Sequence, residues 1–235
     1  DYFAKVAAWK DFLDYRDDEE RTIGWALKAL VSSWRATLNP RYKLAAQMIV
    51  EQAIAGQDPD TGNWDHPLYP NEDKHRPVCL GGKPWMVGII LQGMKRYDME
   101  FHDPRVQNLI CKAADWMIWS EYVYMTCVDS KPGMASANHF DGLTYAWELT
   151  GKRYYLDEAL KGYARTIGSW SSSGGQAFAV NGDVLEPNIN IMRIIREQGE
   201  KVWKDGKPVL DPKSESVAKE IRANPKFKAK PQKRY

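Results

Sequence analysis

The residues best suited to chemistry lie in polar stretches between apolar segments. The richest stretch is DPDTGNWDHPLYPNEDKHRPVCLGGKPW (58–85), which combines acids, bases and aromatic side chains. A second stretch, ANHFDG (137–142), places Asn138, His139 and Asp141 at the start of an apolar segment. Three of the four histidines fall in these two stretches. The two stretches form the candidate site, because a few converging polar groups are typical of a ligand pocket.

Two kinds of sugar chemistry fit these residues. A glycoside hydrolase needs two carboxyl groups roughly 5 to 9 Å apart, and Asp65 and Asp141 are the best pair in the sequence. A lyase that acts on a uronate must neutralise the sugar carboxylate, remove the C5 proton and protonate the leaving oxygen. For that reaction His139, beside Asn138, suits proton removal. His66, His75 and Arg76 could neutralise the carboxylate, and Tyr69 or Tyr124 could be the acid. The sequence leaves both mechanisms open.

Aromatic platforms and cations beside these residues favour a sugar ligand. Sugar rings present apolar faces to aromatic side chains, and a uronate carboxylate needs a positively charged or donor group nearby. His66 is a further candidate catalytic residue, since it could help to neutralise the uronate carboxylate. The candidate substrate-binding residues are Arg21, Trp25, Trp64, Tyr69, His75, Arg76 and Trp85. By contrast, Trp34, Trp116, Trp119 and Trp147 fall within apolar stripes and are predicted to lie in the core.

No cofactor or metal ligand is predicted. The acidic stretch DPDTGNWD (58–65) could hold a structural calcium ion, but it lacks the glutamate and the glycine of an EF-hand. A turn is therefore the preferred interpretation of this stretch. The sequence also lacks a glycine-rich phosphate loop and any histidine or cysteine spacing typical of a metal site.

The same corner recurs three times along the chain and divides it into helix pairs. It appears as TLNPRYKLAAQ (37–47), FHDPRVQNLIC (101–111) and LTGKRYYLDEAL (149–160). Apolar residues recur at helical spacing on both sides of each corner. Asn39 and Asp103 are suited to cap a helix whose first turn contains proline, and Gly151 is suited to end one. Long connections, at about 57–83, 121–136 and 171–186, join the opposite ends of the pairs.

This internal repeat predicts an all-α array of antiparallel helical hairpins, either an open solenoid or a closed ring. A further helix is expected within 1–15. After about residue 170 the pattern changes to two short helical segments, NINIMRIIREQ and SESVAKEIRAN. The final segment, PKFKAKPQKRY, is expected to be a disordered or extended basic tail. The predicted division is a helical-hairpin domain over 1–186 and a C-terminal segment over 187–235.

Two segments, 83–118 and 137–167, carry a family resemblance. KPWMVGIILQGMKRYDMEFHDPRVQNLICKAADWMI and ANHFDGLTYAWELTGKRYYLDEALKGYARTI resemble the (α/α) toroids of the six-hairpin superfamily of glycoside hydrolases and polysaccharide lyases. The resemblance implies a partial toroid and a polysaccharide or oligosaccharide substrate. Asn138 beside His139 is similar to the Asn-His pair of toroid lyases. Because such toroids have about six hairpins, the rest of the ring is expected from the same protein or another chain.

Composition and charge restrict the partners of the protein. With 43% apolar and 27% charged residues, the 235-residue chain is expected to fold, and its net charge of +2 does not favour nucleic-acid or membrane binding. No apolar run is long enough to span a bilayer. Three cysteines form no metal-binding pattern, and three buried thiols are preferred to one disulfide with a free thiol. The chain begins at Asp1, so a processed, trimmed or longer protein is expected. As a carbohydrate-active protein, it is expected in the periplasm or outside the cell.

Three hypotheses for function remain. The first is an enzyme that cleaves a polysaccharide or oligosaccharide, and the second is a non-catalytic glycan-binding or structural toroid. The third is a toroid that acts on an isoprenoid, which would need an acidic motif above an apolar cavity. The only acidic run, DDEE (17–20), is more typical of a solvated helix end, so this hypothesis ranks last.

Overall fold

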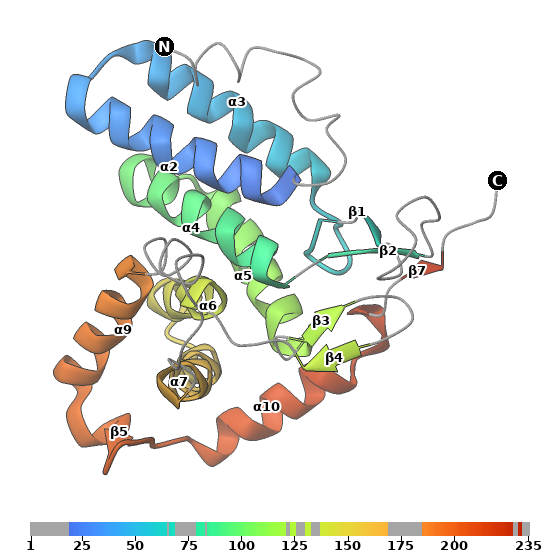
Figure 1. Ribbon diagram of the computed structural model, residues 1–235, viewed down its shortest axis with the longest axis vertical. Coiled ribbons are helices and arrows are strands. Elements are labelled where there is room, and N and C mark those ends of the chain that lie inside the picture. The colour runs from blue at the N-terminus through green and yellow to red at the C-terminus, as the bar shows by residue number, and fades with distance from the viewer. Residues whose placement is uncertain are drawn as a thin grey trace.

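The computed structural model describes residues 19–64, 66–68, 79–82, 84–120, 123–125, 130–132, 137–168, 185–227 and 230–231. These residues are mostly helical, which confirms the all-α class. The helices are α2 (Glu19–Thr37), α3 (Pro40–Gly56), α4 (Pro84–Phe101), α5 (Pro104–Ser120), α6 (Ala137–Thr150), α7 (Arg153–Gly168), α9 (Leu185–Gln198) and α10 (Pro212–Ala223) (Figure 1). In this part of the chain, none of them is long and apolar enough to cross a membrane.

Short strands lie in the long connections and near the C-terminus. β1 (His66–Leu68), β2 (Cys79–Gly81) and β7 (Lys230–Pro231) form a three-stranded sheet in the order β1-β2-β7. β3 (Val123–Met125) pairs with β4 (Ser130–Pro132), and β5 (Trp203–Lys204) pairs with β6 (Lys207–Pro208), all antiparallel. The connections predicted as loops therefore contain local hairpins.

The three repeated corners share one backbone conformation. Leu38, His102 and Gly151 each have a positive φ, of 54°, 52° and 67° respectively. The N–H of each donates to the carbonyl four residues earlier, over 2.7, 2.8 and 2.7 Å. This is the left-handed cap that commonly ends a helix. The repeat seen in the sequence is thus a repeated helix stop.

The helices that follow the first two corners begin with side-chain caps. Asn39 Oδ1 accepts a hydrogen bond from the N–H of Arg41 at 3.1 Å, and Asp103 Oδ1 accepts one from Arg105 at 3.0 Å. Pro at the next position costs nothing, because the first N–H of a helix has no partner within the helix. Both predicted N-caps are confirmed. Asp211 caps α10 in the same way.

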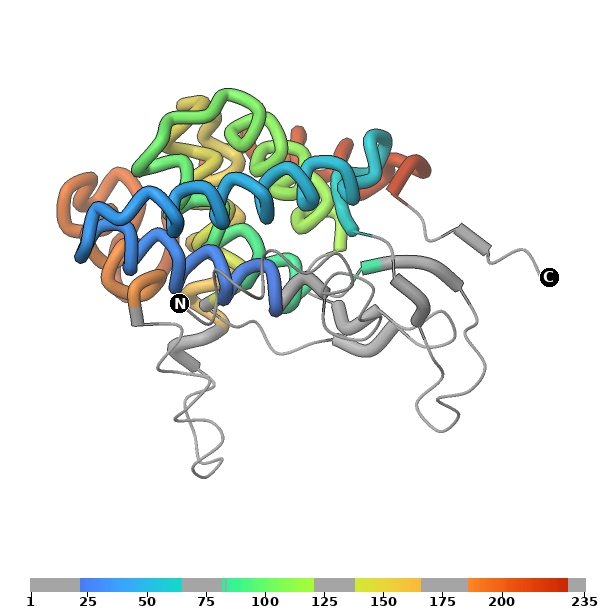
Figure 2. Tube along the Cα trace, turned by 90° about the horizontal axis from the view of Figure 1, so that it is seen from above, coloured from blue at the N-terminus to red at the C-terminus, as the bar shows by residue number. Residues whose placement is uncertain are grey.

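Two layers of helices result. The first helices of the pairs, α2, α4 and α6, lie side by side, and α9 extends this layer beyond α6 (Figure 1). Between α2 and α4, residue numbers increase in the same direction along the contact. Lys28 contacts Gln92, and Arg35 contacts Glu100. The neighbouring helices of this layer are therefore parallel. Figure 2 shows α3, which belongs to the second layer, running alongside α2 of the first layer.

The second layer contains α3, α5 and α7, and α10 crosses it. α10 packs against both α5 and α7 rather than completing a hairpin with α9. Arg222 of α10 and Lys161 of α7 both pair with the buried Glu158 of α7, at 2.5 and 2.8 Å. The division predicted at residue 186 falls inside α9, and the segment after it packs on the same hairpins.

Part of the predicted basic tail is folded. Phe227 is 3% exposed and packs against Trp119 with ring centroids 6.0 Å apart. Burial of an aromatic ring outweighs the charges beside it, so the expectation of a disordered tail was wrong for Pro225–Phe227. The described strand β7 is extended, as one of the alternatives predicted. The helix expected within 1–15 lies outside the described residues.

Glycines set the spacing within the first layer. A Cβ at Gly24 would lie 2.3 Å from Ile89 O, and a Cβ at Gly93 would lie 2.6 Å from Gly24 O. On the other side of α4, a Cβ at Gly88 would lie 2.4 Å from Asn138 O. Helix α4 therefore meets α2 and α6 backbone to backbone, at distances that any larger residue would prevent.

The shared corner predicts opposite changes in the free energy of unfolding for substitutions at Leu38 and Gly151. Leu38 is 68% exposed and pays the steric cost of a left-handed backbone, about 1 to 2 kcal/mol for an L-residue. We expect Leu38→Gly to raise the free energy of unfolding by about 1 kcal/mol, because this strain disappears. Gly151→Ala should lower it by a similar amount. Urea denaturation of both variants measures the changes, and a loss of stability in Leu38→Gly would contradict this account.

A second prediction concerns the helix spacing. We expect Gly88→Ala to lower the free energy of unfolding by about 1 to 3 kcal/mol, because the new methyl group forces α4 and α6 apart. Gly56→Ala is the matched control, since its Cβ would meet only Trp64 at an ordinary 3.5 Å. Thermal denaturation should show Gly56→Ala as stable as the original protein. Equal losses in both variants would exclude a role for the close approach.

Candidate functional site

Asn138, His139 and Asp141 lie at the beginning of α6, against the middle of α4. Their exposed fractions are 4%, 3% and 1%, so all three are buried in the first layer. The close approach at Gly88 brings the α6 backbone at Asn138 against α4. The candidate groups of this stretch thus lie together because a glycine of α4 leaves room for them.

A chain of hydrogen bonds connects three parallel helices at this level. Lys28 Nζ of α2 donates to Gln92 Oε1 of α4 at 3.0 Å. Gln92 Nε2 in turn donates to Asn138 Oδ1 of α6 at 2.7 Å. Gln92 is 4% exposed, and sequence analysis did not select it. Its position seven residues after Trp85, on the same helix face, was the available signal.

One turn further along, Lys95 and Asp141 form a buried ion pair. The Nζ–Oδ1 distance is 2.8 Å, and the two side chains are 6% and 1% exposed. Burial raises the pKa of Asp141, and the ammonium of Lys95 opposes this shift. The charge of Asp141 is therefore balanced within the helix layer. In the unbound protein this carboxylate connects α6 to α4.

A second carboxylate stands close to this pair. Glu186 at the start of α9 pairs with Arg96, whose Nη2 lies 2.5 Å from Glu186 Oε2. Although burial opposes it, hydrogen bonding to Arg96 leaves the pKa of Glu186 lowered overall. The consecutive residues Lys95 and Arg96 thus hold carboxylates from two different helices. Glu186 is 43% exposed in its side chain, whereas Asp141 is not accessible.

The remaining predicted residues divide into three groups. Trp25 is 43% exposed on α2, and Trp85 is half-buried near the start of α4. His66 and Tyr124 lie in β1 and β3, and Arg21 lies in α2, where only the backbone is described. Asp65, Tyr69, His75 and Arg76 lie outside the described residues.

Trp64 is not a sugar platform, contrary to the sequence-based prediction. It is 7% exposed, and its Nε1 donates to Ala53 O at 2.9 Å. The indole is packed under the end of α3, with its polar atom already satisfied. The neighbouring acidic stretch is a turn, as predicted, in which Asp58 Oδ1 accepts from the N–H groups of Asp60 and Thr61. Among the described residues no cluster of three potential metal ligands occurs.

Several candidate residues belong to strands or helices that lie near α4. His66 is paired with Gly81, which lies three residues before the first residue of α4, and β3 with Tyr124 lies beside α4. Asn138 approaches the first half of α4 from α6. The backbones of two connections and of the beginning of α6 therefore lie near α4.

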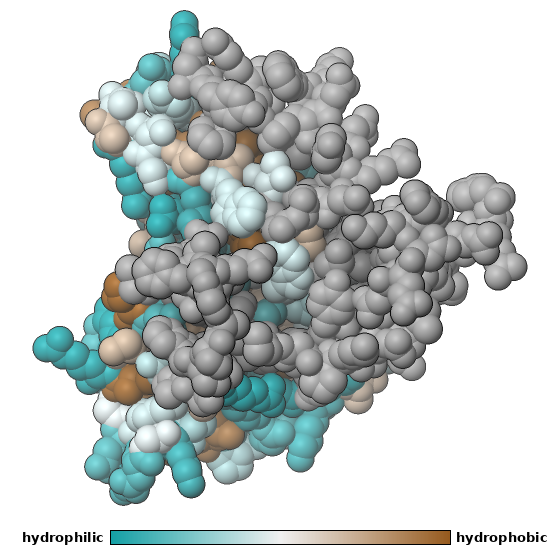
Figure 3. All heavy atoms as spheres, in the orientation of Figure 1, coloured by the Kyte–Doolittle hydropathy of each residue, from teal (hydrophilic) through white to brown (hydrophobic). Residues whose placement is uncertain are grey.

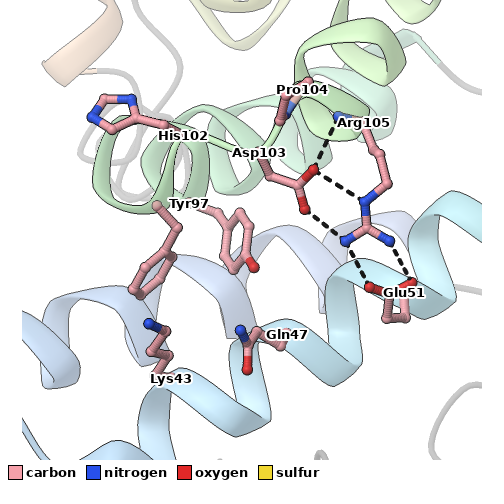
Figure 4. A pocket seen from close by; sticks show the side chains of 9 residues that line it. Lys43, Gln47, Glu51, Tyr97, His102, Asp103, Pro104 and Arg105 are labelled. Carbon is pink, nitrogen blue, oxygen red and sulfur yellow. Dashed lines mark hydrogen bonds and ion pairs between the residues drawn. The ribbon is translucent and has the colours of Figure 1, made fainter.

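An open groove lies at the opposite end of α4, lined by residues of α3, α4 and the second corner. Its volume is about 490 Å³, and Figure 4 shows side chains from α3 and the second corner around it. Arg105 is held by Glu51 at 3.0 Å and by Asp103 at 2.7 Å, which balances its charge. Hydrogen bonding from Arg105 lowers the pKa of Asp103. These contacts fix the corner, so we place the candidate site at the other end.

Cys111 is a free thiol in α5, half-buried and remote from α6 in sequence. Burial raises the pKa of this thiol, and the nearby Asp115 carboxyl raises it further. The thiolate, which is the nucleophilic form, is therefore disfavoured near neutral pH. Cys111 is not a candidate nucleophile.

Comparison of the sequence with protein-family profiles, curated proteins and solved structures finds no match.

The ion pair leads to a pH-dependent prediction. We expect Lys95→Met to lower the free energy of unfolding by about 3 to 5 kcal/mol at neutral pH, because Asp141 must then either keep a buried charge without a partner or take up a proton. The pKa of Asp141, raised further in this variant, lies above its usual value near 3.8. The folded state therefore holds a proton that the unfolded chain releases, and stability should fall as pH rises above about 4.

The double variant Lys95→Met/Asp141→Leu provides the control for this measurement. It replaces both charges with apolar groups and should recover most of the lost stability, with no pH dependence from this site. Urea denaturation between about pH 4 and pH 8 compares the two variants. A single variant whose deficit is the same at both ends of this range would contradict the assignment.

Proposed function

We propose that the protein is a carbohydrate-active enzyme that cleaves a polysaccharide or oligosaccharide, as a lyase or a glycoside hydrolase. The observation that carries this proposal is the convergence of candidate residues around the first half of α4. Two connections, which contain His66 and Tyr124, and the beginning of α6, which contains Asn138, come near α4. The exposed Trp25 on α2 offers an apolar face to a sugar ring.

The parallel first layer supports a toroidal arrangement. In such an arrangement the first helices line the inside, and their beginnings point toward one face. The exposed Ile189 and Met192 lie on one side of α9, and apolar surface is visible over this helix in Figure 3. We propose that further hairpins, from the same protein or another chain, continue the layer there.

The two mechanisms place different demands on these residues. In a lyase, His139 would remove the C5 proton, Asn138 would contact the carboxylate and Tyr124 would protonate the leaving oxygen. In a hydrolase, Asp141 would serve as the acid, and its raised pKa has the direction that an acid requires. However, Asp141 is already paired with Lys95, so a role as the acid would require this ion pair to break, and this contact favours the lyase.

The second candidate function is a non-catalytic glycan-binding or structural protein. The low exposure of Asn138, His139 and Asp141 favours it, because buried groups must be uncovered before they can react. This alternative predicts binding to a glycan without any new product.

The test is a screen for turnover against acidic and neutral glycans. Polygalacturonate, alginate and hyaluronan are compared with xylan and starch, while reducing ends and the ultraviolet absorbance of an unsaturated sugar are followed together. We expect both signals to rise with an acidic glycan, and His139→Gln to reduce the rate at least about 100-fold, as loss of a general base does.

Tyr145→Phe is the matched control variant. It removes the Tyr145 hydrogen bond to Asp98, at 2.7 Å between the same two helices, without touching the candidate groups. Reducing ends without absorbance would indicate a hydrolase. An unchanged rate in His139→Gln, or no product from any glycan, would contradict the proposed role.

A further inference from the structure

The hydrogen-bond chain from α2 to α6 has a fixed direction. An ammonium group can only donate, so Lys28 requires the oxygen of the Gln92 amide on its side. The Gln92 amide must then turn its nitrogen toward Asn138, which accepts through Oδ1. The charge on Lys28 thereby determines the orientation of two successive amides.

The consequence concerns the other end of the Asn138 amide. Oδ1 is used by Gln92, so Nδ2 is the group presented away from the chain of bonds. Nδ2 makes no hydrogen bond with the described part of the protein, although the residue is only 4% exposed. Nδ2 is not among the buried polar atoms that lack a partner in the described residues, so this atom remains accessible and can donate to a ligand.

The local electrostatics favour a negatively charged acceptor. Asn138 belongs to the first turn of α6, where the helix dipole favours negative charge. Lys28 adds a cation at the same level of the layer. Trp25, one turn before Lys28 on α2, is 43% exposed and suits an apolar ring. A sugar acid supplies a ring and a carboxylate together.

We propose that Lys28 and Gln92 are positioning residues that orient the Asn138 amide so that Nδ2 donates to a ligand carboxylate. The identity of the ligand, an acidic sugar, rests on the proposed function. The orientation of the amide rests only on the contacts from Lys28 to Asn138. These two parts can therefore fail separately.

Gln92→Glu reverses the last bond with little change in shape. A carboxylate at this position still accepts from Lys28, but it cannot donate to Asn138 Oδ1. The Asn138 amide must then turn so that Nδ2 donates to the introduced carboxylate and Oδ1 faces the ligand. Because Lys28 balances the new charge, the fold should be retained.

The experiment follows the Asn138 side-chain amide by NMR in the full chain, with sodium glucuronate as the probe and glucose as its neutral counterpart. In the original protein, we expect glucuronate but not glucose to shift the Asn138 amide signals. In Gln92→Glu, the amide protons should exchange more slowly before any probe is added. Glucuronate binding should weaken roughly 10- to 100-fold, as expected for a lost bond to a charged group.

Two further variants separate positioning from general destabilisation. Lys28→Arg keeps a group that only donates and should behave as the original protein does, whereas Lys28→Met should weaken binding. Tyr145→Phe loosens the same helix pair and should leave the Asn138 signals unchanged. Asn138 protons that exchange equally slowly in the original protein and Gln92→Glu would overturn the proposal.

The outcomes also distinguish this proposal from the enzymatic one. An amide that reverses in Gln92→Glu and a shift with glucuronate, in a protein that cleaves no glycan, support the relay and reject the enzyme. Cleavage of an acidic glycan without reversal of the amide supports the enzyme and rejects the relay. A reversal without any response to glucuronate rejects the carboxylate as the acceptor.

Discussion

The close approach of α4 to α2 and α6 is the constraint on which the rest of the structure depends. Gly24, Gly93 and Gly88 let backbones touch at distances where a Cβ would lie 2.6 Å or less from a carbonyl oxygen. Helices at this separation cannot slide past each other without steric conflict. Their polar side chains are therefore held in register, and short hydrogen bonds can form at one level after another.

Polar groups in this layer serve both the structure and the candidate site. Buried ions and amides stabilise little unless each is paired, because removal from water costs several kcal/mol per ion. Lys95 and Asp141 satisfy this condition with each other, and Gln92 satisfies it with Lys28 and Asn138. Among the described residues, the amide of Asn138 is the last group of this chain of hydrogen bonds, and the proposed ligand contact starts from it.

Local signals in the sequence predicted the helices and their corners. The caps at Asn39 and Asp103 depend on residues one or two positions away, so a short stretch of sequence contains the whole interaction. The course of α10 between α5 and α7 depends on ion pairs such as Arg222–Glu158, 64 residues apart, which no local pattern reveals. The prediction for Trp64 failed for the same reason. Its exposure is decided by α3, and an indole in a polar stretch looks the same whether buried or exposed.

The candidate site was predicted only in part. The stretch 137–142 was selected because acids, amides and a histidine precede an apolar segment, and it does lie against α4. Lys28 and Gln92 were not selected, because each stands alone on a helix and gains significance only when parallel helices bring it to Asn138. Sequence spacing identifies groups on one helix, whereas contacts across a layer require the helix separation to be known.

Each corner closes through bonds among residues a few positions apart, from Asp98 to His102 and from Asp103 to Arg105 in the second one. The backbone of the turn is therefore closed by its own residues, and the contact of Arg105 with Glu51 of the neighbouring hairpin is added to it. A unit that closes itself can be duplicated or lost in a gene without redesign of the units beside it. Architectures of this kind can change length by whole hairpins during evolution, while the connections at the other end diverge in sequence and in what they bind.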